Sequence, residues 1–185
     1  MRVYISDISV IEDKKYGGVT FKITGQLQSG LEIKIKDLFY DLQEYIGRYV
    51  EMLLCVFRNP YAEHKMGMIN QPFLSEEYYS IELIDELLEK KGFNSKANKK
   101  RIILTGEYID SYVIPEKWIP LMEPKWFRRI LKEPSAIKTD DGIFLFYPFH
   151  MRKRVSIESF PKNVTIVTGS IDLAAWHPIS ESKGD

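Results

Sequence analysis

The chain has 185 residues, of which 44% are hydrophobic, and its 26 basic residues balance its 26 acidic ones, which gives a formal net charge of zero. This length suits one large domain or two small ones. A neutral chain is unlike a protein that is held to nucleic acid by its overall field, so a nucleic-acid role would need a local basic patch.

The single cysteine limits the chemistry further. Cys55 alone cannot form an intramolecular disulfide, and a zinc site built from several cysteines is excluded. It lies within the apolar run 52–57, where a buried and unreactive thiol is expected. The sequence also shows no secretory leader and no apolar stretch long enough to cross a bilayer, so we expect a cytoplasmic protein with no membrane partner.

The first part of the chain has the pattern of a small antiparallel β structure. Apolar and polar residues alternate over residues 2–10, 19–23 and 31–35, which is typical of strands with one buried face. Residues 38–46 change to helical spacing, with Asp37 placed as the N-cap and Gly47 as the C-terminal stop. Residues 48–57 return to strand, and their continuous apolar centre predicts burial on both faces.

This order of three strands, a short helix and a fourth strand resembles the oligonucleotide/oligosaccharide-binding (OB) fold, a small Greek-key barrel. The resemblance covers about the first sixty residues and rests on topology, because OB folds have no diagnostic motif; other small barrels remain open. A fifth strand is not obvious, since Asn59-Pro60-Tyr61 interrupts the chain.

A similar unit recurs in the second half of the chain. The turn at Ser29-Gly30, followed by a β-rich run, has a counterpart at Asp141-Gly142, and each unit has another β-rich segment upstream. Such repetition is typical of an internal duplication. Between the units, residues 75–91 carry the apolar stripe of an amphipathic helix, and residues 90–101 have the composition of an exposed basic linker.

The predicted fold class is therefore mainly β (β-rich α+β), with two small antiparallel OB-like barrel lobes joined by an amphipathic helix. We assign residues 1–72 to the N-terminal lobe and 73–98 to the connecting helix and linker. Residues 99–179 form the predicted C-terminal β lobe, and 180–185 a flexible tail.

No motif in the sequence identifies a reaction. Phosphate-binding glycine loops, metal-ligand spacings and nucleophile motifs are absent, and the three histidines, His64, His150 and His177, are scattered. Asp110 and Asp172 each follow an isoleucine shortly after a Thr-Gly pair and could meet at a two-fold axis, but aspartates that cap turns are more common. We expect no cofactor, no metal and no catalytic residue, and we leave enzymatic activity open because catalytic groups often meet only in the fold.

Two groups of residues are candidates for binding. Cations and aromatics that suit single-stranded nucleic acid occur at Lys99, Lys100, Arg101, Lys125, Trp126, Arg128, Arg129, Arg152, Lys153 and Arg154. Aromatics that would suit a protein interface are Tyr78, Tyr79, Trp118 and Trp176. The basic residues fit solvated faces equally well, and Trp118, between two prolines, either fills a gap between the lobes or faces a partner.

Two functions remain open after this comparison. The favoured one is a non-catalytic interaction module of an intracellular assembly, which binds a protein partner or itself through exposed aromatics. The alternative is a protein that binds single-stranded DNA or RNA. The neutral charge and interspersed acidic residues favour the first, whereas the resemblance to OB folds favours the second only modestly.

Overall fold

The computed structural model describes residues 1–12, 14, 17–57, 72–74, 102–109, 111–124, 134–147, 163–168 and 171–180. Strands dominate these residues, as the alternating sequence pattern predicts. They are β1 (Arg2–Glu12), β2 (Val19–Leu27), β3 (Glu32–Asp37), β4 (Tyr49–Phe57), β5 (Pro72–Leu74), β6 (Ile102–Ile109), β7 (Ser135–Thr139), β8 (Gly142–Tyr147), β9 (Asn163–Thr168) and β10 (Ile171–Pro178). Two 3₁₀ segments, η1 (Gln43–Tyr45) and η2 (Glu116–Leu121), complete the described elements.

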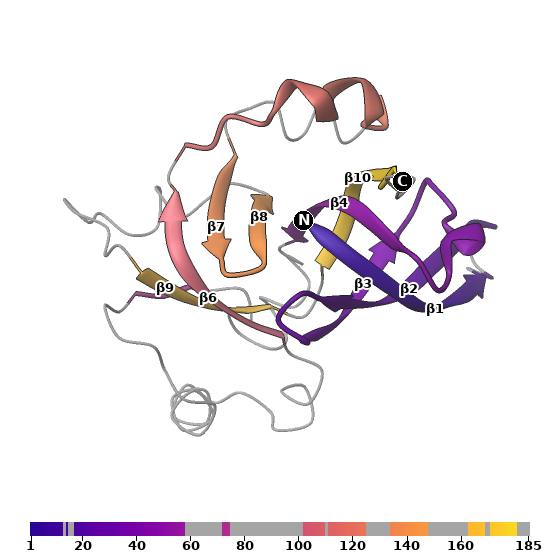
Figure 1. Ribbon diagram of the computed structural model, residues 1–185, viewed down its shortest axis with the longest axis horizontal. Coiled ribbons are helices and arrows are strands. Elements are labelled where there is room, and N and C mark those ends of the chain that lie inside the picture. Colours follow the sequence, from indigo (N-terminus) through magenta and orange to yellow (C-terminus); the bar gives the residue numbers. More distant parts are fainter. Residues whose placement is uncertain are drawn as a thin grey trace, which may run out of the picture.

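Five strands close into a small barrel, seen on the right of Figure 1. Their order is β1-β2-β3-β10-β4, and β4 pairs again with β1 to close the ring. All neighbours are antiparallel except β3 and β10, which run parallel. A closed barrel of five strands is compatible with the OB-like barrel expected from the sequence, and its fifth strand comes from the far end of the chain.

The barrel interior is filled by the apolar residues that alternate along its strands. Ile33 and Ile35 of β3 are buried while their neighbours in the strand are exposed, except for Asp37 at the strand end. Gly25 of β2 marks the tightest contact, because a Cβ at this position would lie 2.6 Å from Val3 Cγ1. A side chain here would therefore push β1 and β2 apart.

The segment between β3 and β4 closes one end of the barrel. Asp37 is buried and accepts N–H bonds from Phe39, Tyr40 and Asp41 at 2.9–3.1 Å, so it stabilises the turn after β3 and is not the N-cap of a helix as predicted. Burial raises the pKa of Asp37, although these three donors oppose the shift. The segment forms a loop and the short η1 rather than the expected helix over 38–46, and it places the fully buried Leu42 in the core.

The sheet continues beyond the barrel through β4. Strand β8 pairs parallel with β4, and β7, β6, β9 and β5 follow in that order, on the left of Figure 1. The turns at Ser29 and Asp141, which the sequence suggested as equivalent positions of a repeat, lie against each other: the Asp141 carboxylate accepts bonds from Ser29 N and Oγ at 2.8 and 2.7 Å. These bonds join the barrel to the β7–β8 hairpin.

A second apolar cluster covers the outer face of β4 and β10. Leu53 and Cys55 of β4 face Ile114, Trp118 and Met122 of the η2 segment, which crosses the top of Figure 1. Strand β4 thus has a core on both faces, which confirms the prediction from its continuous apolar run.

The described residues show one continuous sheet with a single closed barrel. Strand β10, which the sequence placed in the C-terminal lobe, pairs inside the N-terminal barrel. The second barrel and the duplication stay predictions. The helix predicted over 75–91 lies outside the described residues, as do residues 181–185 of the tail predicted over 180–185.

Candidate functional site

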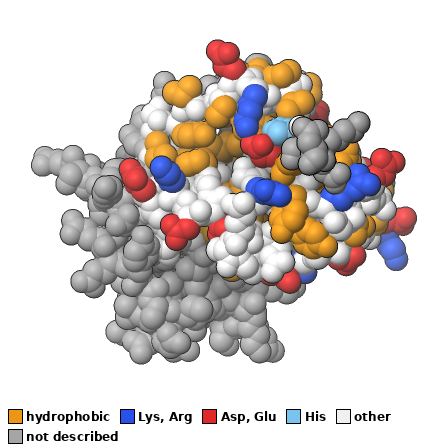
Figure 2. Space-filling view, viewed as in Figure 1, with side chains coloured by type: hydrophobic (Ala, Val, Ile, Leu, Met, Phe, Trp, Pro, Cys, Tyr) orange, Lys and Arg blue, Asp and Glu red, His pale blue; other side chains and the backbone are white. Residues whose placement is uncertain are grey.

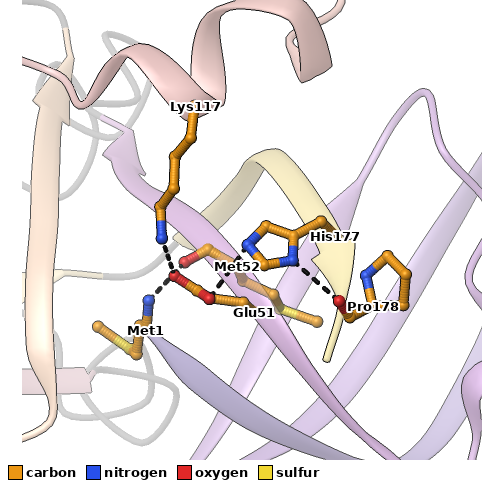
Figure 3. A network of polar contacts seen from close by, with 6 residues as sticks. All are labelled: Met1, Glu51, Met52, Lys117, His177 and Pro178. Atoms are coloured by element: carbon orange, nitrogen blue, oxygen red, sulfur yellow. Dashed lines mark hydrogen bonds and ion pairs between the residues drawn. The ribbon is translucent and has the colours of Figure 1, made fainter. Parts of the chain in front are cut away.

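A row of polar side chains crosses the outer face of the barrel. Glu51 of β4 lies between Arg2 of β1 and His177 of β10, because the registers Arg2↔Glu51 and Glu51↔His177 place the three side by side. Lys117 of η2 reaches the same carboxylate: its Nζ lies 2.5 Å from Glu51 Oε1, and His177 Nε2 lies 3.0 Å from Oε2 (Figure 3). Both carboxylate oxygens of Glu51 are therefore engaged.

The contacts of His177 orient its ring. Its Nδ1 lies 2.9 Å from the Pro178 carbonyl oxygen, so both ring nitrogens face acceptor oxygens (Figure 3). Both contacts are hydrogen bonds only when each nitrogen carries a proton. The centroid of the ring also lies 5.1 Å from that of the Trp118 indole, and Lys117 Nζ lies 5.2 Å from the indole centroid.

A second connection joins the η2 segment to the barrel through Tyr40. Its hydroxyl donates to the Ala174 carbonyl at 2.5 Å and accepts the Glu123 N–H at 2.9 Å. Burial raises the pKa of Tyr40, and the charges of Glu123 and Asp37 add to this effect, so the neutral donor form is favoured. Residues 111–124 are thus held to the barrel by Trp118, by Glu51 and by Tyr40.

The electrostatics of Glu51 give a pH prediction. Burial alone would raise its pKa, but the hydrogen bond and charge of Lys117, with His177, outweigh this and hold the pKa below the ordinary 4.5. A folded-state pKa that is depressed stabilises the protein above the unfolded value, and this contribution disappears as the pH falls through the folded value. We expect the urea unfolding midpoint to fall more steeply with acidification below about pH 4.5 in the natural protein than in Glu51→Gln.

The difference between these two curves isolates Glu51, because every other carboxylate titrates in both proteins. Glu44→Gln, at an exposed position of η1, serves as the control and should follow the natural protein. Parallel curves for the natural protein and Glu51→Gln would contradict the assigned contacts.

A different surface lies at the end of the β1–β2 hairpin. Val10 pairs with Phe21 and Glu12 with Val19, so the side chains of Val10 and Val19 are diagonal neighbours, about 7–8 Å apart, on one face. Phe21 pairs in turn with Asp37, which brings the end of β3 beside them. We call this the hairpin-end surface, and its exposed apolar residues are Val10, Val19, Leu38 and Phe39.

The outer face of β2 and β3 carries a third feature, a group of lysines. Lys22 and Lys36 lie directly opposite each other in the antiparallel pair, and Lys34 is next along β3 on the same face. Lys34 Nζ bonds Thr24 Oγ1 at 2.6 Å and lies 3.6 Å from Glu32, whereas Lys22 and Lys36 have no ion pair with another described residue. Like charges placed opposite each other destabilise a strand pair.

The structure places few of the residues that the sequence suggested for binding. Trp118 is buried, 3% exposed, and packs on the outer face of the barrel. Trp176 is half-buried, with its ring centroid 4.8 Å from that of Tyr45. The remaining predicted residues lie outside the described ranges: Tyr78, Tyr79, Lys99, Lys100, Arg101, Lys125, Trp126, Arg128, Arg129, Arg152, Lys153 and Arg154.

Asp172, one of the two acidic residues suggested as a paired site, does not lie beside His177. Asp172 and His177 occupy the two ends of β10, opposite Cys55 and Glu51, and Asp110 lies outside the described residues. Cys55 is fully buried, and burial, with the charge of Asp172, raises its pKa well above 9.0, which agrees with an unreactive thiol. Among the described residues, no three His, Cys, Asp or Glu side chains gather as metal ligands.

Comparison with known proteins adds no assignment. No family model, no curated protein and no solved structure matches this chain. Within the described part of the chain, no helix is both long enough and apolar enough to cross a membrane.

Sequence reasoning missed all three surfaces described here. The lysines could have been found, since Lys22, Lys34 and Lys36 occupy the polar positions of predicted strands. The Glu51 row had no local signal, because its members come from four segments that only the barrel and η2 bring together.

Proposed function

We propose that this protein is a binding module that contacts another protein chain through exposed apolar and aromatic side chains of its barrel. The observation that carries the proposal is the hairpin-end surface, where four large apolar side chains are each at least 38% exposed on adjoining segments. Scattered apolar side chains are normal on a protein surface, whereas a group of them marks an interaction site.

The distribution of charge supports the same role. The formal net charge is zero, and the face shown in Figure 2 has Lys and Arg side chains interspersed with Asp and Glu around hydrophobic patches. A protein interface tolerates this mixture, because charged residues belong at its rim and apolar ones at its centre.

The test compares proteins recovered by cross-linking and co-purification from cells that express tagged variants. The double variant Val19→Ser with Leu38→Ser removes two apolar side chains from the hairpin-end surface. Val113→Ser is the control, since Val113 is 86% exposed on a different segment. We expect at least one protein recovered with the natural chain and the control to be lost with the double variant. An identical set of recovered proteins for all three would contradict the proposal.

A second candidate function is binding of single-stranded nucleic acid, and the lysines on β2 and β3 favour it. Lys22 and Lys36 oppose each other without a described acidic partner. A phosphate group placed between them would reduce the repulsion between their positive charges. The described outward-facing residues of β2 and β3 include no aromatic side chain, so phosphate contacts would provide most of the affinity.

A salt series tests the second candidate. We expect the natural protein to bind short single-stranded DNA or RNA at low salt, with affinity that falls as salt rises. Lys22→Gln with Lys36→Gln should weaken binding and reduce the log–log salt slope by about 1.4, since each phosphate contact contributes about 0.7. Lys138→Gln, at an exposed position of β7, is the control. Absence of binding at low salt, or an unchanged slope in the double variant, would rule this function out.

A further inference from the structure

Over half its length, one edge of β1 has no strand partner among the described residues. Strand β1 pairs with β4 through Arg2, Val3 and Tyr4, and two further bonds join Ile5 to Gly47 and Arg48. From residue 7 to residue 12, β1 pairs with β2, and no described strand pairs with its other edge. The backbone N–H and C=O groups on this edge are placed to pair with another strand.

The middle of this edge lacks the features that usually prevent pairing. Edge strands are commonly protected by charged residues, by proline or by bulges. Here a bulge lies between Ile5 and Asp7, and acidic residues stand only at positions 7 and 12. Residues 8–11 are Ile-Ser-Val-Ile, and Val10 and Ile11 are each 50% exposed although they point to opposite faces. A strand added here would find apolar neighbours on both faces.

The residues of this edge are complementary to themselves. In an antiparallel arrangement about a two-fold axis at Ser9, Ile8 of each copy lies opposite Val10 of the other, and Asp7 lies opposite Ile11. Opposed residues then share a face, as antiparallel pairing requires, and no two acidic residues oppose each other. The zero net charge also removes long-range repulsion between copies.

We propose that two copies of this chain associate through residues 7–12 of β1, paired antiparallel about a two-fold axis at Ser9. This inference rests on the proposed function, because it names a second copy as the chain that binds beside the hairpin-end surface. Two-fold dimers are the commonest protein oligomers, and their interface uses the same residues on both subunits. A six-residue edge is small beside a standard interface of about 1,600 Å², so the dimer dissociates on dilution.

The first test is sedimentation velocity of the purified protein from low micromolar to submillimolar concentration, at low and high salt. We expect the mass to rise from monomer toward dimer, with little dependence on salt. Val10→Lys places a charge on the edge and should remain monomeric with an unchanged melting temperature, whereas Val113→Lys should dimerise as the natural protein does. A monomer at all concentrations, or dimerisation of Val10→Lys equal to that of the natural chain, overturns the proposal.

The second test fixes the register. Ser9→Cys places two thiols directly opposite each other on the two-fold axis, and mild oxidation should give a disulfide-linked dimer. The natural Cys55 is fully buried and does not interfere, and Val113→Cys measures random collision. A dimer without enhanced cross-linking at residue 9 overturns the pairing about Ser9. A monomeric chain that still loses a co-purifying protein in Val19→Ser with Leu38→Ser would overturn this inference and leave the proposed function standing.

Discussion

Replacing Trp118 with alanine is expected to lower the free energy of unfolding by about 3–5 kcal/mol, the usual cost of removing a large buried aromatic side chain. Trp118 is 3% exposed and packs in the cluster that covers the outer face of β4 and β10. Its removal leaves a cavity between the η2 segment and the barrel. Urea denaturation followed by circular dichroism measures the loss.

The matched control is Leu121→Ala, in the same 3₁₀ segment but 39% exposed, which should change stability by about 0.5 kcal/mol or less. Trp118 also positions Lys117 beside Glu51. Glu51→Gln should therefore cost less in the Trp118→Ala background than in the natural protein, because neighbouring residues are not additive. Equal losses for Trp118→Ala and Leu121→Ala would show that the segment does not pack on the barrel.

The sequence predicts the strands of the barrel well because their signal is local. Alternation over residues 19–23 and 31–35 corresponds to β2 and β3, and the unbroken apolar run of β4 corresponds to a strand between two cores. Gly47 was identified correctly as the C-terminal stop and has a φ of 84°, whereas Asp37, predicted as a helix N-cap, accepts three backbone N–H bonds in a turn that precedes η1. A cap fixes where a segment turns, but it does not decide between a helix and a 3₁₀ loop.

The closing strand could not be predicted from local pattern. Strand β4 ends at Phe57 and its partner β10 begins at Ile171, and nothing in either segment specifies the other. The similar turns at Ser29 and Asp141 suggested two equivalent lobes, whereas in the structure these turns bond to each other. Both ends of a chain can contribute to one sheet, so similar neighbouring patterns do not show separate barrels.

The candidate surfaces could not be predicted from the sequence for the same reason. Alternation with Phe21 and Ile23 would have placed Val19 in the core, whereas Val19 is 45% exposed near the end of the β1–β2 hairpin. For Trp118, the neighbouring prolines in the sequence were compatible with either burial or exposure. The packing of η2 against the barrel is what buries this side chain.

Replacing Gly106 with alanine is expected to destabilise the protein by about 1–3 kcal/mol or more, as overpacking of a close contact does. A Cβ at this position of β6 would lie 2.1 Å from the Lys138 carbonyl oxygen and 2.8 Å from its carbon. These are backbone atoms of the neighbouring β7, which cannot rotate away as a side chain would. The two strands must separate, and pairing of Glu107 with Lys138 is lost first.

Gly18→Ala is the control for this change, because a Cβ at Gly18 meets nothing within 4 Å and its φ is not in the left-handed region. It should be neutral or stabilise by about 0.4–1 kcal/mol through the unfolded chain. Hydrogen exchange distinguishes a local from a global effect: in Gly106→Ala, amides of β6 and β7 should lose protection while those of β2 and β3 keep theirs. Equal stability of the two variants would contradict the close approach of β6 and β7, and uniform loss of protection would show that the barrel and the outer strands unfold as one unit.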